Sequence, residues 1–332
     1  MRWTAFILLI GMAACSRREA SRPGEQLSGL YLIHQNGHMG YVDAKGNLRI
    51  PPQFDQAAPF SDGLAVVAIG GRAGYIDTSG RVAINPRFDS GAPFSEGLAA
   101  VREGSAWGFI DKHGKMVIAP QYRDPGGAPI QFSEGLAAVA TSAGPRVGYV
   151  DRSGKMTIAP QFDSAAQFSD GLALVTVGGR YGYIDKDGKL AIRPQFDEGQ
   201  NFYEDRAAVR SGQKWGYIDR SGKMVVSPQF DQARGYSDGL AIVEANGRIG
   251  FVDKSGAMAV APRFDAANDF SAGRAPVRVG DRWGFIDKNG KMVITPQFDN
   301  ARPFSLTLAP VQLGSAWGYV NRDGKFVWNP TA

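Results

Sequence analysis

The sequence predicts an all-β protein made of about nine tandem 34-residue units, each a small three-stranded antiparallel sheet. The first observation is a phrase, Gly-aromatic-Ile/Val-Asp/Asn, that starts nine times, at Gly40, Gly74, Gly108, Gly148, Gly182, Gly216, Gly250, Gly284 and Gly318. Seven of the eight intervals are 34 residues, and the remaining one is 40. The second is that each copy holds three short runs rich in β-branched and aromatic residues, bounded by Gly or Pro, which is typical of strands.

The three strands of one unit are expected near residues 98–101, 107–111 and 115–120. The middle and last strands are joined by a hairpin in which Asp bonds to its own backbone and Gly takes the left-handed position. That glycine recurs in every unit, as Gly46, Gly80, Gly114, Gly154, Gly188, Gly222, Gly256, Gly290 and Gly324. The repeated Asp is therefore expected to cap a turn and to bind no ligand.

The connection to the next unit is also patterned. Pro296 is expected to end the last strand, because proline cannot donate to a ladder. Phe298, Ala301 and Phe304 follow at i, i+3 and i+6, which predicts a tight loop or single helical turn with all three side chains inward. Phe162 is accordingly expected in the core.

The N-terminal residues indicate export and lipid attachment. Residues 1–14 are interpreted as a signal peptide, with a charge at Arg2 and an apolar run too short to span a bilayer. The sequence Met12-Ala13-Ala14-Cys15 resembles the lipobox of bacterial lipoproteins, which implies lipidation of Cys15, the only cysteine. Residues 15–28 are then a lipidated flexible tether and 29–332 the repeat array. Ser16 resembles the outer-membrane pattern of Gram-negative lipoproteins, which implies an envelope protein facing the periplasm or the surface.

Composition excludes several classes of function. Lys plus Arg is 37 and Asp plus Glu is 32, a net charge of +5 without a basic cluster, so no nucleic-acid partner is expected. A single cysteine excludes a disulfide or a Cys-rich metal site. The three histidines, His34, His38 and His113, are expected at the surface. We expect no cofactor, no metal and no catalytic residues, and therefore no enzyme activity.

The repeated phrases resemble a known family. Trp107-Gly108, Trp215-Gly216, Trp283-Gly284 and Trp317-Gly318, with the Gly-Lys and Pro-Gln-Phe-Asp segments that follow, are similar to the WG-repeat family of bacterial proteins. The resemblance covers nearly the whole mature chain and implies a repeat protein often found at bacterial surfaces, without an activity. Two departures stand out: Phe-Ser-Asp/Glu-Gly becomes Phe202-Tyr203-Glu204-Asp205, and one unit carries extra residues near 124–130.

Two architectures suit such units. An open superhelical stack resembling a β-solenoid is favoured, because nine three-stranded units fit poorly to a β-propeller, which typically has four to eight four-stranded blades. The β-propeller is the alternative.

The functional hypothesis is a lipid-anchored, non-enzymatic binding or scaffold module of the cell envelope. Its partners would be the membrane, through the lipid, and cell-wall polysaccharide or envelope proteins. Trp107, Trp215, Trp283 and Trp317 are the candidate ligand contacts, because Trp combines a large apolar area with a donor. The alternative is an envelope hydrolase or a ligand-binding propeller with its site near the 124–130 insertion, since insertions in repeat arrays often lie on binding faces.

Overall fold

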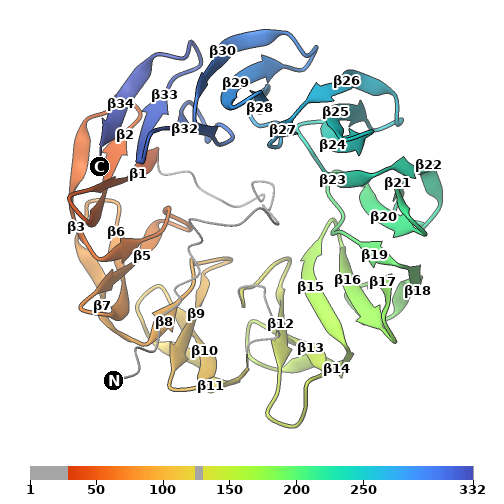
Figure 1. Ribbon diagram of the computed structural model, residues 1–332. Coiled ribbons are helices and arrows are strands. Elements are labelled where there is room, and N and C mark those ends of the chain that lie inside the picture. The colour runs from red at the N-terminus through yellow and green to blue at the C-terminus, as the bar shows by residue number, and fades with distance from the viewer. Residues whose placement is uncertain (1–28, 124–129, 332) are drawn as a thin grey trace, which may run out of the picture.

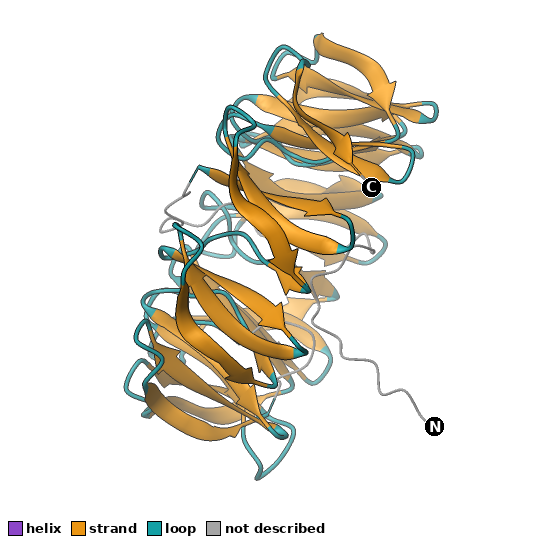
Figure 2. Cartoon of the chain, turned by 90° about the vertical axis from the view of Figure 1, so that its left-hand side faces the viewer, coloured by secondary structure: helices purple, strands orange, loops and turns teal. Residues whose placement is uncertain are grey.

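The computed structural model describes residues 29–123 and 130–331 and arranges them as nine antiparallel sheets in a closed ring, a nine-bladed β-propeller (Figure 1). Turned by 90°, the ring is seen from its edge (Figure 2). The all-β prediction of nine tandem sheets is confirmed. The preference for an open stack is wrong, and the alternative that was kept, a propeller, is the fold.

Blades are numbered in chain order, and the strands of each run from the centre of the ring outward. Blades 1 to 3 consist of β1 (Leu30–Gln35), β2 (His38–Asp43) and β3 (Leu48–Phe54); β4 (Gln56–Ala57), β5 (Leu64–Ile69), β6 (Arg72–Asp77) and β7 (Val82–Phe88); and β8 (Ser90–Gly91), β9 (Leu98–Glu103), β10 (Ala106–Asp111) and β11 (Met116–Tyr122).

Blades 4 to 6 follow. Their strands are β12 (Leu136–Ala140), β13 (Val147–Asp151) and β14 (Met156–Phe162); β15 (Ser164–Ser169), β16 (Leu172–Val177), β17 (Arg180–Ile184) and β18 (Leu190–Phe196); and β19 (Glu198–Gly199), β20 (Ala207–Ser211), β21 (Lys214–Ile218) and β22 (Met224–Phe230).

Blades 7 to 9 complete the ring. Their strands are β23 (Gln232–Ser237), β24 (Leu240–Ala245), β25 (Arg248–Asp253) and β26 (Met258–Phe264); β27 (Ala266–Ala267), β28 (Arg274–Val279), β29 (Arg282–Asp287) and β30 (Met292–Phe298); and β31 (Asn300–Ala301), β32 (Ala309–Leu313), β33 (Ala316–Val320) and β34 (Phe326–Thr331).

The short innermost strand is the element that the sequence did not predict. In seven blades the start of the connection pairs with the next strand, as where Ala57 lies opposite Val67, so these sheets have four strands. Only three strands of blades 1 and 4 lie in the described ranges. The inward placement of the connection is confirmed, because Phe298, Ala301 and Phe304 are all buried. The Phe304 ring packs on Phe285, 5.1 Å between centroids.

The glycine of each Gly-aromatic phrase lies against the backbone of the outermost strand. A Cβ added to Gly108 would lie 2.5 Å from the Ile118 carbonyl oxygen and 2.7 Å from the Pro120 nitrogen. The strand register shifts at this point, so the outer strand bulges over the glycine. The prediction that proline ends the strand is wrong: β11 continues through Pro120, because an edge strand can accommodate proline at a bulge.

The hairpin glycines join neighbouring blades. Gly188 has a φ of 79°, as the predicted left-handed turn requires. A Cβ on it would lie 2.8 Å from the Ile158 side chain of the preceding blade. The hairpin of each blade therefore packs on the outer strand of the one before it, which is why this glycine recurs at every unit.

The ring closes where blade 9 meets blade 1. A Cβ on Gly46 would lie 2.2 Å from the Val327 carbonyl oxygen, so the hairpin of blade 1 packs on β34. Tyr31 packs on Tyr319 at 5.4 Å between ring centroids, and the Tyr319 hydroxyl donates to the Leu32 carbonyl at 2.6 Å. Closure covers the two sheet faces that an open stack would leave exposed at its ends.

A candidate binding site on the turn face

The turn face is the side of the ring that carries two kinds of turn. One is the Ser-Asp/Glu-Gly turn leading into the second strand of a blade, and the other is the Asp-x-x-Gly hairpin between its third and fourth strands. Alternate turns of an antiparallel meander lie at the same end of the sheet, so both kinds face the same way. The acidic residue of the first turn, which the sequence analysis did not single out, is the main functional group here.

Six consecutive blades present this acid, as Asp62, Glu96, Glu134, Asp170, Glu204 and Asp238. Each has a φ between 52° and 56°, which is uncommon for a residue other than glycine. Each carboxylate accepts an N–H from the corresponding turn of the next blade. Asp238 accepts from Gly273 at 2.6 Å, and Asp62 accepts from Gly97 at 2.7 Å. The acids therefore join the blades as well as displaying charge.

Several of these acids also form an ion pair with a lysine in the Asp-x-x-Gly hairpin of the next blade. Lys186 lies 3.1 Å from Glu134, Lys254 lies 3.2 Å from Glu204, and Lys288 lies 2.7 Å from Asp238. All six side chains keep between 29% and 49% of their surface exposed. Such exposed pairs stabilise the fold by about 1 kcal/mol at most, and they display alternating charge to solvent.

The serine of the same turn makes a second inter-blade bond. Ser237 Oγ donates to the Phe270 carbonyl at 2.7 Å, and Ser271 Oγ donates to the Phe304 carbonyl at 2.7 Å. These serines are therefore structural.

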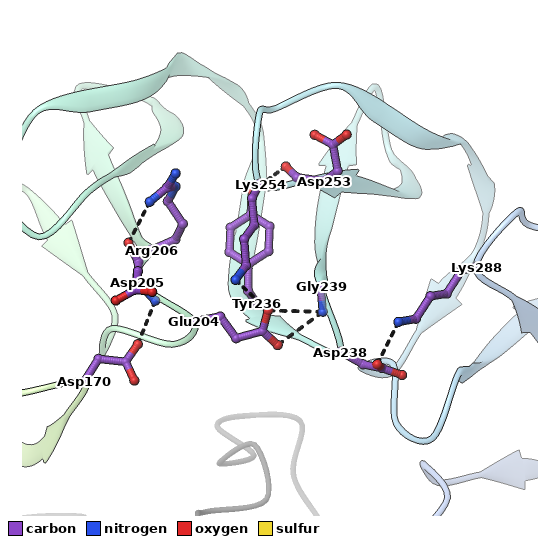
Figure 3. A network of polar contacts seen from close by, with 10 residues as sticks. All are labelled: Asp170, Glu204, Asp205, Arg206, Tyr236, Asp238, Gly239, Asp253, Lys254 and Lys288. Atoms are coloured by element: carbon purple, nitrogen blue, oxygen red, sulfur yellow. Dashed lines mark hydrogen bonds and ion pairs between the residues drawn. The ribbon is translucent and has the colours of Figure 1, made fainter.

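Blade 6 departs from the pattern, and Figure 3 shows its surroundings. Tyr203 replaces the serine, and its ring lies where a Cβ on Gly235 would be, 2.6 Å away, so glycine is required opposite it. Asp205 replaces the usual glycine at a φ of 64° and donates its N–H to Asp170 at 2.8 Å. Arg206 replaces the usual leucine and donates to the Asp205 carbonyl at 3.0 Å. The departure that the sequence analysis noted is thus a local enrichment in charge.

Burial and hydrogen bonding fix the protonation of nearby groups. Burial raises the pKa of Tyr236, whose hydroxyl donates to the Asp253 carbonyl at 2.7 Å. The hydrogen bond from the Ser255 hydroxyl lowers the pKa of Asp253, which accepts the N–H groups of its own hairpin. This confirms the predicted capping role of the repeated Asp. Tyr236 is therefore a neutral donor and Asp253 an anion, and both are held by structural bonds.

The four candidate tryptophans lie at the opposite end of the blades, beside the hairpins between the second and third strands. Trp107, Trp215, Trp283 and Trp317 pair across the sheet with Arg102, Arg210, Arg278 and Gln312. Trp215 is 5% exposed, and the other three are partly buried. The Arg302 guanidinium also stacks on Trp317 at 4.4 Å from the ring centre. Trp215 belongs to a buried hydrophobic cluster, and Trp107 and Trp283 pack against two others, so packing accounts for these positions. The structure does not bring the four rings together.

The histidines, the N-terminal segment and the insertion are the remaining features that the sequence singles out. His34, His38 and His113 are exposed, as predicted. Within residues 29–123 and 130–331, no group of three or more His, Cys, Asp or Glu residues could hold a metal ion. The same ranges contain no helix long and apolar enough to cross a membrane. The signal peptide, Cys15, the tether and residues 124–129 of the insertion lie outside the described residues; of that insertion only Ile130 is described, and it is buried.

Comparison with known proteins places the chain in a repeat family. The family described as WG containing repeat matches eight segments, residues 39–72, 74–105, 107–141, 148–181, 181–215, 215–248, 249–283 and 283–315. No curated protein sequence matches the chain.

One solved structure of clearly similar fold is found, and two others match less well. A eukaryotic initiation factor matches with a TM-score of 0.65 at 13% identity, over 90% of this chain and 94% of that one. Apo AztD from Citrobacter koseri matches with a TM-score of 0.46 at 11% identity, over 83% and 95%. The dihydro-heme d1 dehydrogenase NirN matches with a TM-score of 0.45 at 15% identity, over 85% and 76%.

Proposed function

We propose that this chain, which belongs to the family of WG-containing repeat proteins, is a non-enzymatic binding module of the cell envelope that captures a partner protein on its turn face. Cys15 would carry a lipid that holds the module at the outer membrane, and residues 15–28 would serve as the tether.

The observation that carries this proposal is the arrangement of charge on the turn face. Acid–lysine pairs join neighbouring blades at three junctions of the ring, and their side chains remain partly exposed. Complementary charge patterns of this kind favour specific and rapid protein association. The acids are also engaged by backbone N–H groups, so binding would not require the turns to reorganise.

The test of binding is capture from envelope extract by the full-length protein solubilised in detergent. We expect charge reversal at two exposed lysines, Lys254→Glu with Lys288→Glu, to reduce the captured protein at least about tenfold, because each change places like charges together. The matched control is Lys291→Glu with Lys325→Glu, which alters exposed lysines that form no ion pair within the described residues. Equal capture by both double variants, or retention of purified cell-wall polysaccharide in place of protein, would contradict the proposal.

The anchor has a separate test. Cells that express the full chain and are supplied with a labelled fatty acid should label the wild-type protein and not Cys15→Ser. Label on Cys15→Ser would show that the attachment is elsewhere.

A further inference from the structure

The series of acids ends before the ring does. At the position of Asp238, blade 8 carries Ala272 and blade 9 carries Leu306. Ala272 is exposed, so a carboxylate from outside the chain can reach this position.

The donors that serve such a carboxylate elsewhere are still present around Ala272. Asp238 receives the N–H of Gly273 and the ammonium of Lys288, which lies 50 residues further along the chain. The same positions one blade later are the N–H of Thr307 and the guanidinium of Arg322. Thr307 N–H makes only a long contact, 3.4 Å to the Tyr31 hydroxyl. The exposed Arg322 has no carboxylate partner in the ranges 29–123 and 130–331.

A second arginine adds an independent observation. Arg274 takes the position that is leucine in most blades, and its Nη1 is buried without a hydrogen-bond partner in the described part of the chain. Blade 6 has the equivalent Arg206 in a turn that also supplies Glu204 and Asp205. There Nη1 donates to the Asp205 carbonyl, while Nε is buried without a partner in the described part of the chain. Blade 8 thus keeps the arginine and lacks both acids. A buried donor without a partner costs free energy unless something satisfies it.

The nearby acidic side chains of the chain itself do not pair with Arg274 or Arg322. Asp287 lies opposite Arg274 in the sheet, but its Oδ1 accepts the N–H groups of Asn289 and Lys291. Asp323 is adjacent to Arg322 in the sequence, and no ion pair joins the two among the described residues.

We propose that Thr307 N–H, Arg322 and Arg274 form a carboxylate-binding site at Ala272, and that its ligand is an Asp or Glu side chain of the partner protein. A polypeptide carboxylate is the group that fills the equivalent position in six other blades, so the site already has the shape for one. Leu306, 41% exposed in the next turn, offers an apolar contact beside it. This assignment rests on the proposed function and deepens it.

The probe is N-acetyl-glutamate N-methylamide, which carries one side-chain carboxylate, with the glutamine analogue as its uncharged match. Titrated into the full-length protein and followed by NMR, the acid should shift the Thr307 amide saturably and the amide analogue should not. Arg322→Gln should weaken binding about tenfold, because one charge-assisted hydrogen bond is lost. Lys325→Gln, an exposed lysine on the same hairpin, is the matched control and should bind as wild type does.

Ala272→Asp gives a second and independent readout. It restores the repeat, so its own carboxylate should occupy the site, block the probe and raise the thermal midpoint. Equal shifts by both probes, unchanged binding by Ala272→Asp, or tighter binding of galacturonate than of the glutamate probe would overturn the assignment. If capture of envelope protein depends on Lys254 and Lys288 while Ala272→Asp has no effect on it, this site fails and the proposed function stands.

Discussion

At the residue scale, the repeated glycines have two physical roles that sequence repetition alone cannot separate. Gly108 and its equivalents allow the outer strand to approach closely, with a φ outside the left-handed region. Gly188 and its equivalents have a positive φ and also face the neighbouring blade. Gly178 has a positive φ with no atom near its missing Cβ, so it needs only the conformation.

Alanine substitution at two of these glycines should separate the free-energy cost of a positive φ from the cost of the steric contact with the neighbouring blade. Gly188→Ala meets the unfavourable φ and the Ile158 side chain, and should lower the free energy of unfolding by about 2–3 kcal/mol. Gly178→Ala meets only the φ cost, about 1 kcal/mol. Urea denaturation measures both. Equal losses would mean that the contact between Gly188 and Ile158 is unimportant.

The buried tyrosines predict a pH dependence. Burial raises the pKa of Tyr75, Tyr149 and Tyr183 above the ordinary 10.0. Because the folded-state pKa exceeds the unfolded one, their contribution to stability is complete below pH 10 and is lost as the pH rises above it. An alkaline titration should show exposed tyrosines ionising first and the buried ones only as the near-ultraviolet circular dichroism collapses. Complete ionisation with that signal intact would contradict their burial.

At the scale of the element, each connection contributes to the core. Phe162 ends β14, is 3% exposed, and packs in a cluster with Tyr149, Ile158 and Phe168. Phe162→Ala should lower the free energy of unfolding by about 3–5 kcal/mol, from lost burial and the cavity left behind. A variant that melts like the wild type would contradict this placement. Val117→Ala, at a 42% exposed position on β11, is the control and should change little.

At the scale of the whole molecule, closure depends on one junction that differs from the others. In blade 5 the Tyr183 hydroxyl donates to the Gln200 carbonyl, 17 residues on in the next blade, and four other blades make the equivalent bond. At the junction of blades 9 and 1, here called the seam, the Tyr319 hydroxyl donates instead to the Leu32 carbonyl of β1. The seam therefore joins the ends of the chain with bonds of its own.

Tyr319→Phe should weaken the seam by about 1–2 kcal/mol, because the Leu32 carbonyl loses its donor. Hydrogen exchange should then accelerate in blades 1 and 9 more than elsewhere. Tyr183→Phe removes the corresponding bond inside the ring, and is the control: its effect should be confined to blades 5 and 6. Uniform acceleration in either variant would indicate that the seam is no weaker than other junctions.

The candidate site could be predicted only in part. The sequence displays the Ser-Asp/Glu-Gly phrase and its change at Tyr203, but each acid binds an N–H in the next blade, 35 residues on for Asp238 and Gly273. Its lysine lies 50 residues away. Such contacts follow from how two sheets are stacked, which no local pattern shows. The tryptophans were candidates because of their residue type, whereas three of them pack in or against the hydrophobic clusters between blades.

The sequence by itself determined most of the unit: its three longer strands, its Asp-Gly hairpin, its buried connection and its repetition nine times. These depend on alternation, turn chemistry and apolar content, which act over a few residues. Only the tertiary structure decided that the units close into a ring, since closure depends on the rotation between neighbouring sheets and on whether the last meets the first. That rotation is set by packing between blades, as where Gly46 meets Val327, residues 281 positions apart (327 − 46).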